Sequence, residues 1–113
     1  MTKVEAVIRR ERVETVISAV EQETGHVGIT VMEVVGHGKQ RGITHEYRGR
    51  IFESRFLPKA YIFMLVRDEI AEKVMQAIAD AANTDTIGDG IVWRTKIDQA
   101  LHIRTGQPME SYN

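Results

Sequence analysis

The 113-residue chain is predicted to be an α+β sandwich, with a four-stranded antiparallel sheet and two helices on one face. Segments with the two-residue period of strands alternate with segments of helical period, in the order strand, helix, strand, a long break, then strand, helix, strand. With 42% apolar residues, a chain of this length can build one core, so residues 1–113 are expected to form a single domain.

The first half of this pattern ends near residue 35. Apolar and polar residues alternate from Val4 to Ile8, which predicts a half-buried strand. Apolar residues at helical spacing predict a helix from about Glu11 to Glu23, and Gly25 follows where a helix commonly ends. A return of β-branched residues predicts a second strand over Val27–Val35.

The second half begins at residue 60. The run Ala60–Val66 is apolar on both sides, as expected of a central strand. Asp68 is predicted to cap a helix whose apolar face reaches Ala81. A fourth strand is expected over Ile91–Lys96, then a short helical segment over Ile97–Leu101. Two such halves give the ferredoxin-like βαββαβ arrangement.

This arrangement leaves one face of the sheet without helices. Val31, Ile62 and Trp93 are candidates for apolar positions on its two faces. A domain this small would normally cover such a face by oligomerising.

The break His37–Lys59 has no sustained periodicity, and breaks of this length usually carry function. Six cations and two carboxylates give it a net charge of +4, although the whole chain carries −1. The balanced total argues against a general nucleic-acid binder.

Several classes of protein are excluded or disfavoured by composition. Without cysteine the chain has no disulfide, zinc–thiolate site or thiol nucleophile, and we expect a cytoplasmic protein with no signal peptide. No apolar run is long enough to span a bilayer. The four histidines lack metal-site spacing and no serine lies in a G-x-S-x-G motif, so we expect no enzyme.

Glycine clusters are the candidate ligand sites. Gly36–Gly42 and Gly88–Gly90 could present backbone amides to an anion, and Arg104 could pair with a phosphate oxygen. Taken singly, each has an ordinary alternative: a hinge, a turn and a solvated arginine.

Together these motifs resemble those of one family, the P-II signal-transduction proteins. The matching stretches cover nearly the whole chain in order and spacing: Glu5–Arg9, Gly28–Val34, Gly36–Gly42, Glu46–Gly49, Phe56–Lys59, Ile87–Gly90 and Ile103–Gly106.

The resemblance implies a homotrimer with nucleotide sites in the clefts between subunits. ATP and ADP would compete there, and Mg-ATP would help to bind 2-oxoglutarate. A T-loop over about 37–56 would dock on a target protein, a B-loop over about 82–90 would lie beneath the phosphates, and a C-terminal loop over about 102–113 would reach a neighbouring site.

The resemblance also implies a role for individual residues. Gln40 would bind magnesium when ATP is present. The other assignments are nucleotide binding by Thr30, Gly36, His37, Gly38, Lys39, Gln40, Leu65, Thr84, Gly88, Asp89, Gly90, His102 and Arg104; 2-oxoglutarate binding by Gln40, Arg41, Gly42 and Lys59; and partner binding by Arg41, Tyr47, Arg48, Arg50 and Phe52.

The chain departs from the family pattern at five of its positions. Ile91 stands where the family has a phosphate-binding lysine, and His102 and Lys39 each replace an arginine. Phe52 lacks the hydroxyl that many relatives modify, and Arg50 replaces a serine. We therefore expect an atypical sensor that favours ADP or AMP over ATP, binds 2-oxoglutarate weakly and regulates a transporter or enzyme. The alternatives are an ordinary regulator binding Mg-ATP and 2-oxoglutarate, and a metal-binding trimer of similar fold.

Overall fold

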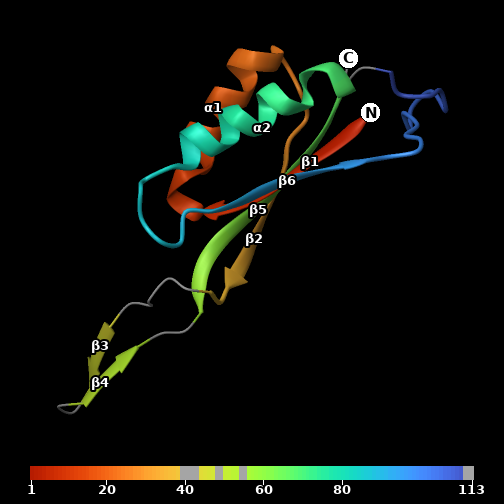
Figure 1. Ribbon diagram of the computed structural model, residues 1–113. Helices are drawn as coiled ribbons and strands as arrows, with labels where there is room; N and C mark the ends of the chain where they lie inside the picture. The colour runs from red at the N-terminus through yellow and green to blue at the C-terminus, as the bar shows by residue number, and fades with distance from the viewer. Residues whose placement is uncertain (39–43, 48–49, 54–55, 111–113) are drawn as a thin grey trace.

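The computed structural model describes residues 1–38, 44–47, 50–53 and 56–110 (Figure 1). Its elements in chain order are β1 (Thr2–Arg9), the 3-10 turn η1 (Arg10–Arg12), α1 (Val13–Thr24), β2 (Thr30–Gly36), β3 (Thr44–Tyr47), β4 (Arg50–Glu53), β5 (Leu57–Val66), α2 (Asp68–Ala82) and β6 (Gly90–Lys96).

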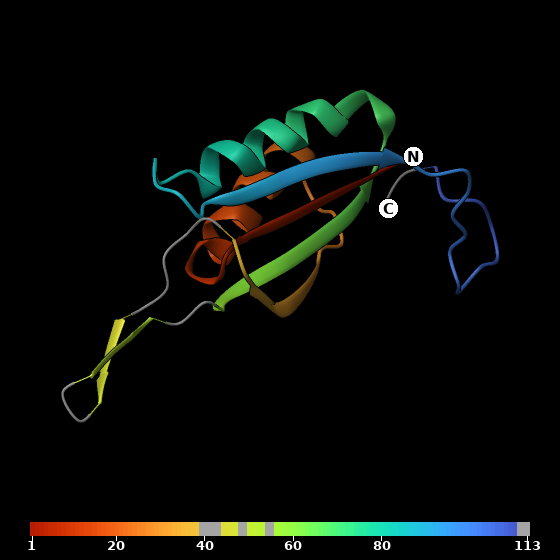
Figure 2. The same cartoon turned by 60° about the horizontal axis from the view of Figure 1, so that its bottom comes forward.

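The main sheet is antiparallel throughout, with strand order β2-β5-β1-β6. Both helices pack on the same face, as two views of the chain show (Figures 1 and 2). The predicted ferredoxin-like α+β sandwich is confirmed.

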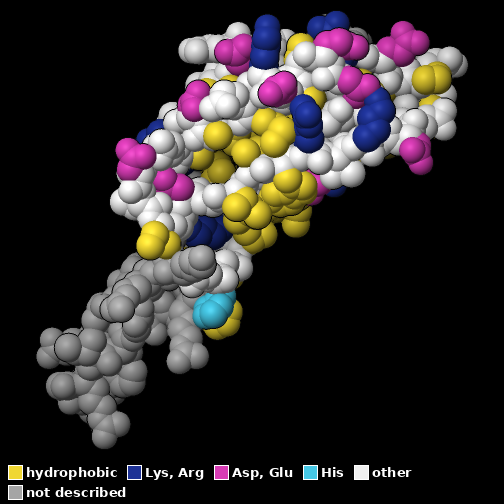
Figure 3. Space-filling view, in the orientation of Figure 1, with side chains coloured by type: hydrophobic (Ala, Val, Ile, Leu, Met, Phe, Trp, Pro, Cys, Tyr) yellow, Lys and Arg dark blue, Asp and Glu magenta, His cyan; other side chains and the backbone are white. Residues whose placement is uncertain are grey.

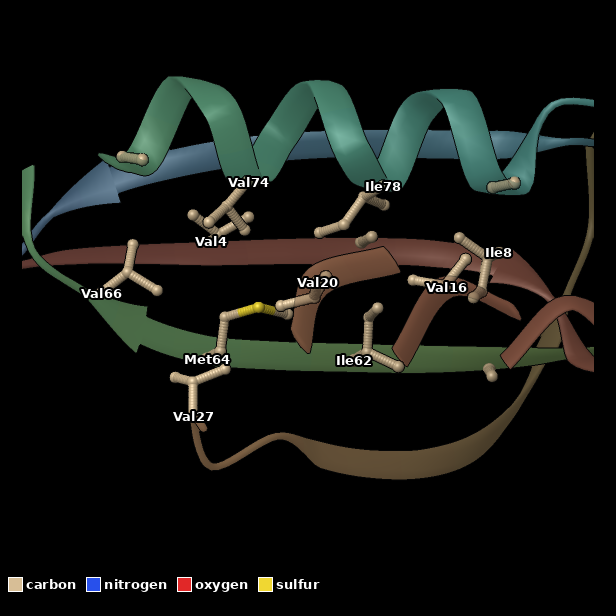
Figure 4. Close-up of a cluster of buried hydrophobic side chains, with 14 residues drawn as sticks. Val4, Ile8, Val16, Val20, Val27, Ile62, Met64, Val66, Val74 and Ile78 are labelled. Atoms are coloured by element: carbon tan, nitrogen blue, oxygen red, sulfur yellow. The ribbon is translucent and has the colours of Figure 1, made fainter. Parts of the chain in front are cut away.

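The core lies between this sheet and the helices. Alternation along β1 buries Val4, Ala6 and Ile8, each at most 1% exposed, against Val16 of α1 and Ile78 of α2 (Figure 4). Complete burial of an aliphatic side chain is worth about 1.5–3 kcal/mol, so the two-residue and helical periods of the sequence converge on one stabilising cluster.

The first helix begins and ends close to its predicted bounds. Gly25 follows α1 with a positive φ of 76°, and its N–H donates to the carbonyl of Glu21 at 2.8 Å. This bond satisfies a carbonyl that the end of the helix would otherwise leave free. The second strand begins at Thr30, three residues later than predicted.

The prediction that Asp68 caps the second helix is wrong. Arg67 is the N-cap residue and makes no side-chain cap bond, and Asp68 is the first helical residue. Its carboxylate accepts a hydrogen bond from Thr2 Oγ1 at 2.7 Å and pairs with Lys96 and with the N-terminal amine. Charged donors bind a carboxylate more strongly than neutral backbone amides do, which explains why Asp68 is turned toward them.

The predicted helical segment over Ile97–Leu101 is also wrong. Leu101 instead forms an antiparallel bridge with Pro108, and the N–H of His102 donates to the carbonyl of Gln107 at 2.9 Å. Five residues are too few to offset the cost of helix nucleation, whereas this turn closes several backbone hydrogen bonds with its own residues.

The long break contains two strands that its sequence did not predict. β3 and β4 pair antiparallel, with Thr44 opposite Glu53 and Tyr47 opposite Arg50. This hairpin lies beyond the end of the main sheet, where β2 ends and β5 begins (Figure 1). β5 itself starts at Leu57, three residues before the predicted Ala60.

The sequence left open which face of the sheet Val31, Ile62 and Trp93 occupy, and the register fixes it. Ile62 pairs with Val31 and with Ala6, so these three lie on the helix-covered side, where Ile62 is buried and Val31 is 41% exposed at the sheet edge. Of the three candidates, Trp93 alone lies on the opposite, helix-free side, which we call the open face. Figure 3 shows hydrophobic side chains exposed along β6.

A cluster of half-buried polar side chains occupies the middle of the open face. Tyr61 Oη and Trp93 Nε1 donate to the two carboxylate oxygens of Glu5 at 2.5 and 3.1 Å. The hydrogen bond from Tyr61 lowers the pKa of Glu5, and the same bond raises the pKa of Tyr61. With its carboxylate satisfied in this way, the apolar part of the open face can be covered without leaving a charge unpaired.

Candidate functional site

A hollow of about 370 Å³ lies at the end of the main sheet from which the β3–β4 hairpin extends. We call it the glycine hollow. The antiparallel register brings its parts together, because Gly36 at the end of β2 lies opposite Leu57 and Gly90 at the start of β6 lies opposite Ile8. Its lining residues are Val7, Gly36, His37, Gly38, Lys59, Gly88, Gly90 and Ile91.

Two of these glycines are required by the packing. Gly90 has φ of 107°, and a Cβ there would lie 1.9 Å from the carbonyl oxygen of Val7. A Cβ on Gly36 would lie 2.9 Å from Cγ of Lys59. The absence of side chains leaves backbone exposed at the rim, which suits close approach by a ligand.

Lys59 is the cation within this lining. It is 9% exposed, and its Nζ donates to the carbonyl oxygen of Gly88 at 2.6 Å. Burial, followed by the nearby charge of Arg9, lowers the pKa of Lys59 from its usual value. The contact ties the centre of the sheet to the loop before β6.

That loop, the B-loop (residues 82–90), is organised around the carboxylate of Asp89. Thr84 donates twice, from its backbone N–H to Oδ2 at 2.6 Å and from Oγ1 to Oδ1 at 2.5 Å. These bonds, led by the Thr84 hydroxyl, hold the pKa of Asp89 well below its usual range. The N–H of Asp89 donates to Thr86 O at 3.3 Å, so this amide is engaged inside the loop.

Arg9 is the residue of this site that the sequence did not indicate. It ends β1 on the open face and pairs in register with Lys59. Its Nε donates to Asp89 Oδ1 at 3.0 Å, and its Nη2 donates to Thr86 Oγ1 and to Ile87 O, both at 2.9 Å. The available signal was position: the alternation that faces Val7 toward the open side also places Arg9 there, one strand away from the predicted Gly88–Gly90 loop.

The remaining nucleotide candidates lie in the other half of the sheet. Thr30 pairs with Phe63, and Leu65 pairs with Lys3, near the end where β6 leads into the C-terminal loop. Leu65 is eight residues along β5 from Leu57, a span of about 26 Å. His102 and Arg104 belong to the C-terminal loop, which lies at the opposite end of the molecule from the hairpin (Figure 2).

The structure thus brings together one subset of the predicted residues and separates another. The first subset is Gly36, His37, Gly38, Lys59, Thr84, Gly88, Asp89 and Gly90; the second is Thr30, Leu65, His102 and Arg104. Lys39, Gln40, Arg41, Gly42 and Arg48 lie outside the described residues, and Tyr47, Arg50 and Phe52 are described only as backbone of β3 and β4.

The chemistry available at the glycine hollow favours an anion. Exposed backbone at glycines and two nearby cations, Lys59 and Arg9, are typical of phosphate recognition. Across the described ranges, no three His, Asp or Glu side chains are grouped to hold a metal ion. Within the residues that the structure describes, neither α1 nor α2 has the length and apolar character needed to cross a membrane.

The order of strands, glycines and loops is that of a known family. The family model described as nitrogen regulatory protein P-II matches residues 1–107. This chain belongs to the P-II family.

Its P-II relatives match over nearly their whole length. The nitrogen regulatory protein P-II of Rhodobacter capsulatus is 44% identical over 110 residues, which are 97% of this chain and 97% of that protein. The protein of the same name from Rhizobium meliloti is 42% identical over 107 residues, 95% of each chain. Nitrogen regulatory protein P-II 2 of Methanothermobacter thermautotrophicus is 42% identical over 107 residues, 95% of this chain and 92% of the relative.

P-II proteins are signal-transduction regulators, not enzymes. They act as trimers on target proteins and bind ATP, ADP and 2-oxoglutarate in general.

Proposed function

We propose that the protein is a cytoplasmic, homotrimeric sensor of adenine nucleotides that regulates a transporter or enzyme through its T-loop. The observation that carries this proposal is the separation of the candidate ligand residues to opposite ends of one sheet. A single chain cannot enclose a nucleotide with both groups, whereas two neighbouring chains can if the hollow of one lies beside the C-terminal loop of the next. The site would then combine the glycine hollow of one subunit with Thr30, Leu65, His102 and Arg104 of the next.

The open face supports the same assembly. Tyr61, Phe63 and Trp93 are only half-buried on it, although each is large and apolar over most of its surface. Such aromatic side chains are those that protein interfaces bury most favourably. Three copies packed through this face would cover them and align the two halves of each site.

The charge around the hollow favours short phosphate chains. Ile91 lines the hollow and is 67% exposed, at the position where the family has a lysine. Lys59 is already bonded to Gly88 O, so it offers little free charge to a third phosphate. ADP or AMP should therefore bind at least as well as ATP.

Binding of 2-oxoglutarate should be weak for a related reason. In the family's mode the acid is held through a magnesium ion that all three phosphates of ATP also bind. A triphosphate that lacks its lysine would place this ion poorly, even with Gln40, Arg41, Gly42 and Lys59 available to the acid.

The proposed output segment is the T-loop. Its β3–β4 hairpin extends away from the sheet, and the segment 37–59 carries a net charge of +4, of which +3 lies within residues 37–56; the remaining cation is the buried Lys59. We propose that it docks on an acidic surface of the partner, with an affinity that falls as salt is added, because exposed charges are screened beyond about 8 Å at physiological ionic strength.

Calorimetry with ATP, ADP and AMP, each with and without magnesium and 2-oxoglutarate, tests the ligand assignment. The proposal expects ADP to bind at least as tightly as ATP and expects little heat from 2-oxoglutarate. A tenfold preference for ATP would refute the nucleotide selectivity. Micromolar 2-oxoglutarate binding that is lost in Gln40→Ala would instead support the ordinary P-II regulator.

Mixed trimers test the shared site. Ile91→Glu places a negative charge in the hollow and Arg104→Gln removes the charge of the C-terminal loop, so each variant alone should bind ADP poorly. In randomly mixed trimers, about a quarter of the sites would join an intact hollow to an intact Arg104 and recover binding. No recovery, or a monomeric mass by light scattering with full binding, would overturn the shared cleft. Arg94→Gln, an exposed arginine of β6, is the matched control and should bind normally.

A further inference from the structure

Arg9 contacts three residues in the second half of the B-loop. One guanidinium donates to a side chain and a carbonyl in the middle of the loop, at Thr86 and Ile87, and to the carboxylate of Asp89 near its end. The acceptors lie 77 to 80 residues away in sequence, so the interaction is entirely tertiary.

We infer that Arg9 is a positioning residue, which holds the B-loop in its binding conformation before any ligand arrives. This inference rests on the proposed function, because it assigns the B-loop to phosphate binding. A loop already ordered loses little conformational entropy when it binds, so ligand affinity is higher than with a loop that must order first.

The geometry requires an arginine at this place. Nε and Nη2 donate from one rigid plane to acceptors on three different residues, which the single ammonium of a lysine on a flexible stem cannot match. The charge matters as well, because Asp89 carries its negative charge inside the loop and Arg9 pairs with it at 3.0 Å. Removing that pairing would leave Oδ1 of Asp89 with only the hydroxyls of Thr84 and Thr86, and no cation.

Lys59 completes the support from the neighbouring strand. It lies opposite Arg9 in the β1–β5 register and donates to the carbonyl of Gly88. The last residue of β1 and the third residue of β5, which are paired in register, therefore hold four consecutive loop residues, from Thr86 to Asp89. Arg9 itself is not among the residues that line the glycine hollow, which distinguishes a positioning role from direct ligand contact.

Hydrogen exchange of the ligand-free trimer tests the inference without relying on nucleotide. The amides of Thr84 and Asp89 both donate hydrogen bonds inside the loop, so they report its order. In Arg9→Gln we expect both amides to exchange at least tenfold faster, while amides of the buried strands, such as that of Ile62, keep their protection. Arg9→Lys should fall between the two, and Arg10→Gln, an exposed neighbour, should match wild type.

Calorimetry with ADP supplies the second readout, and we expect about tenfold weaker binding by Arg9→Gln, with Arg9→Lys intermediate. Unchanged exchange at Thr84 and Asp89 would overturn the inference. Weaker ADP binding with unchanged exchange would also overturn it, because Arg9 would then act directly on the ligand. If wild type binds no adenylate although exchange responds to Arg9→Gln, the proposed function fails and the structural role of Arg9 stands. If Arg9→Gln does not fold, the Arg9→Lys comparison decides the matter.

Discussion

Replacing Gly90 by alanine should destabilise this protein far more than the same change at Gly38 or Gly106. Gly90 has φ of 107°, a region that L-residues rarely occupy, and strain of this kind costs about 1–3 kcal/mol. The new Cβ would also lie 1.9 Å from the carbonyl oxygen of Val7, so the start of β6 must move by more than 1 Å to relieve the contact. Breaking the backbone pairing of Gly90 with Ile8 would add about 1–3 kcal/mol, which gives a total of about 2–6 kcal/mol.

Thermal unfolding at a fixed protomer concentration measures this loss. At about 4 °C per kcal/mol for a domain of this size, Gly90→Ala should lower Tm by at least about 8 °C. Gly38→Ala has open space around the new methyl group and should change Tm little, and Gly106→Ala has φ of 70° but open space, so its loss should be intermediate. A Tm for Gly90→Ala within 2 °C of that of Gly38→Ala would refute the reasoning from the Val7 contact.

Three further predictions concern the site and the core. Ile91→Lys should raise the affinity for ATP relative to ADP by about tenfold, since one charge-assisted contact is worth about 1.5–3 kcal/mol before screening. Calorimetry with both nucleotides on wild type and on Ile91→Lys measures this change. Hydrogen bonds lower the pKa of Asp89 in the folded state, so its stabilising contribution is complete above the unfolded pKa of 3.8 and is lost as the pH falls toward the folded pKa. Between pH 5 and pH 2 the Tm of Asp89→Asn should therefore fall less steeply than that of wild type. Ile78→Ala, at a position 1% exposed, should cost about 2–5 kcal/mol in urea unfolding, whereas Ile78→Val should cost about 0.5–1.5 kcal/mol, and equal losses would argue against close packing there.

The main sheet and helices could be predicted from sequence because their burial follows one period over many residues. β1 alternates buried and half-buried positions without exception, and Val16 and Val20 of α1 face it at helical spacing. Local pattern and tertiary packing agree there, so either alone indicates the element.

The errors fall where a tertiary contact decides the outcome. Asp68 is of a residue type that often caps the N-terminus of a helix, but its carboxylate pairs with Lys96, which is 28 residues away. The β3 and β4 strands are only four residues each, so they give little periodic signal. The face of Ile62 depends on the register between strands, which a run apolar on both sides does not specify.

The residues of the candidate site likewise divide into those that the sequence indicates locally and one that only a tertiary contact reveals. Gly36, Gly88 and Gly90 could be found from sequence. Their backbone conformations and close contacts require glycine, so the glycines themselves stand out in the sequence at these positions. Arg9 could not be found from sequence, because its three acceptors lie in a loop 77 to 80 residues further along the chain and an arginine at the end of a strand is common. Its role follows only from the register that places β1 beside β6.

The position of the glycine hollow explains how a bound nucleotide could reach a distant partner. Gly36–Gly38 line the hollow and also begin the segment that leads to the β3–β4 hairpin, so under the proposed function one stretch of backbone would serve both the ligand and the output. His37 and Phe56 face each other with ring centroids 5.4 Å apart, which ties the outgoing and returning chains together at the base of the hairpin. A ligand shifts a conformational equilibrium only as far as it binds one state better than the other. The glycine hollow is lined by Gly36–Gly38 as well as by Gly88 and Gly90, so under the proposed function the backbone at Gly36–Gly38 is where adenylate binding would be coupled to the position of the hairpin.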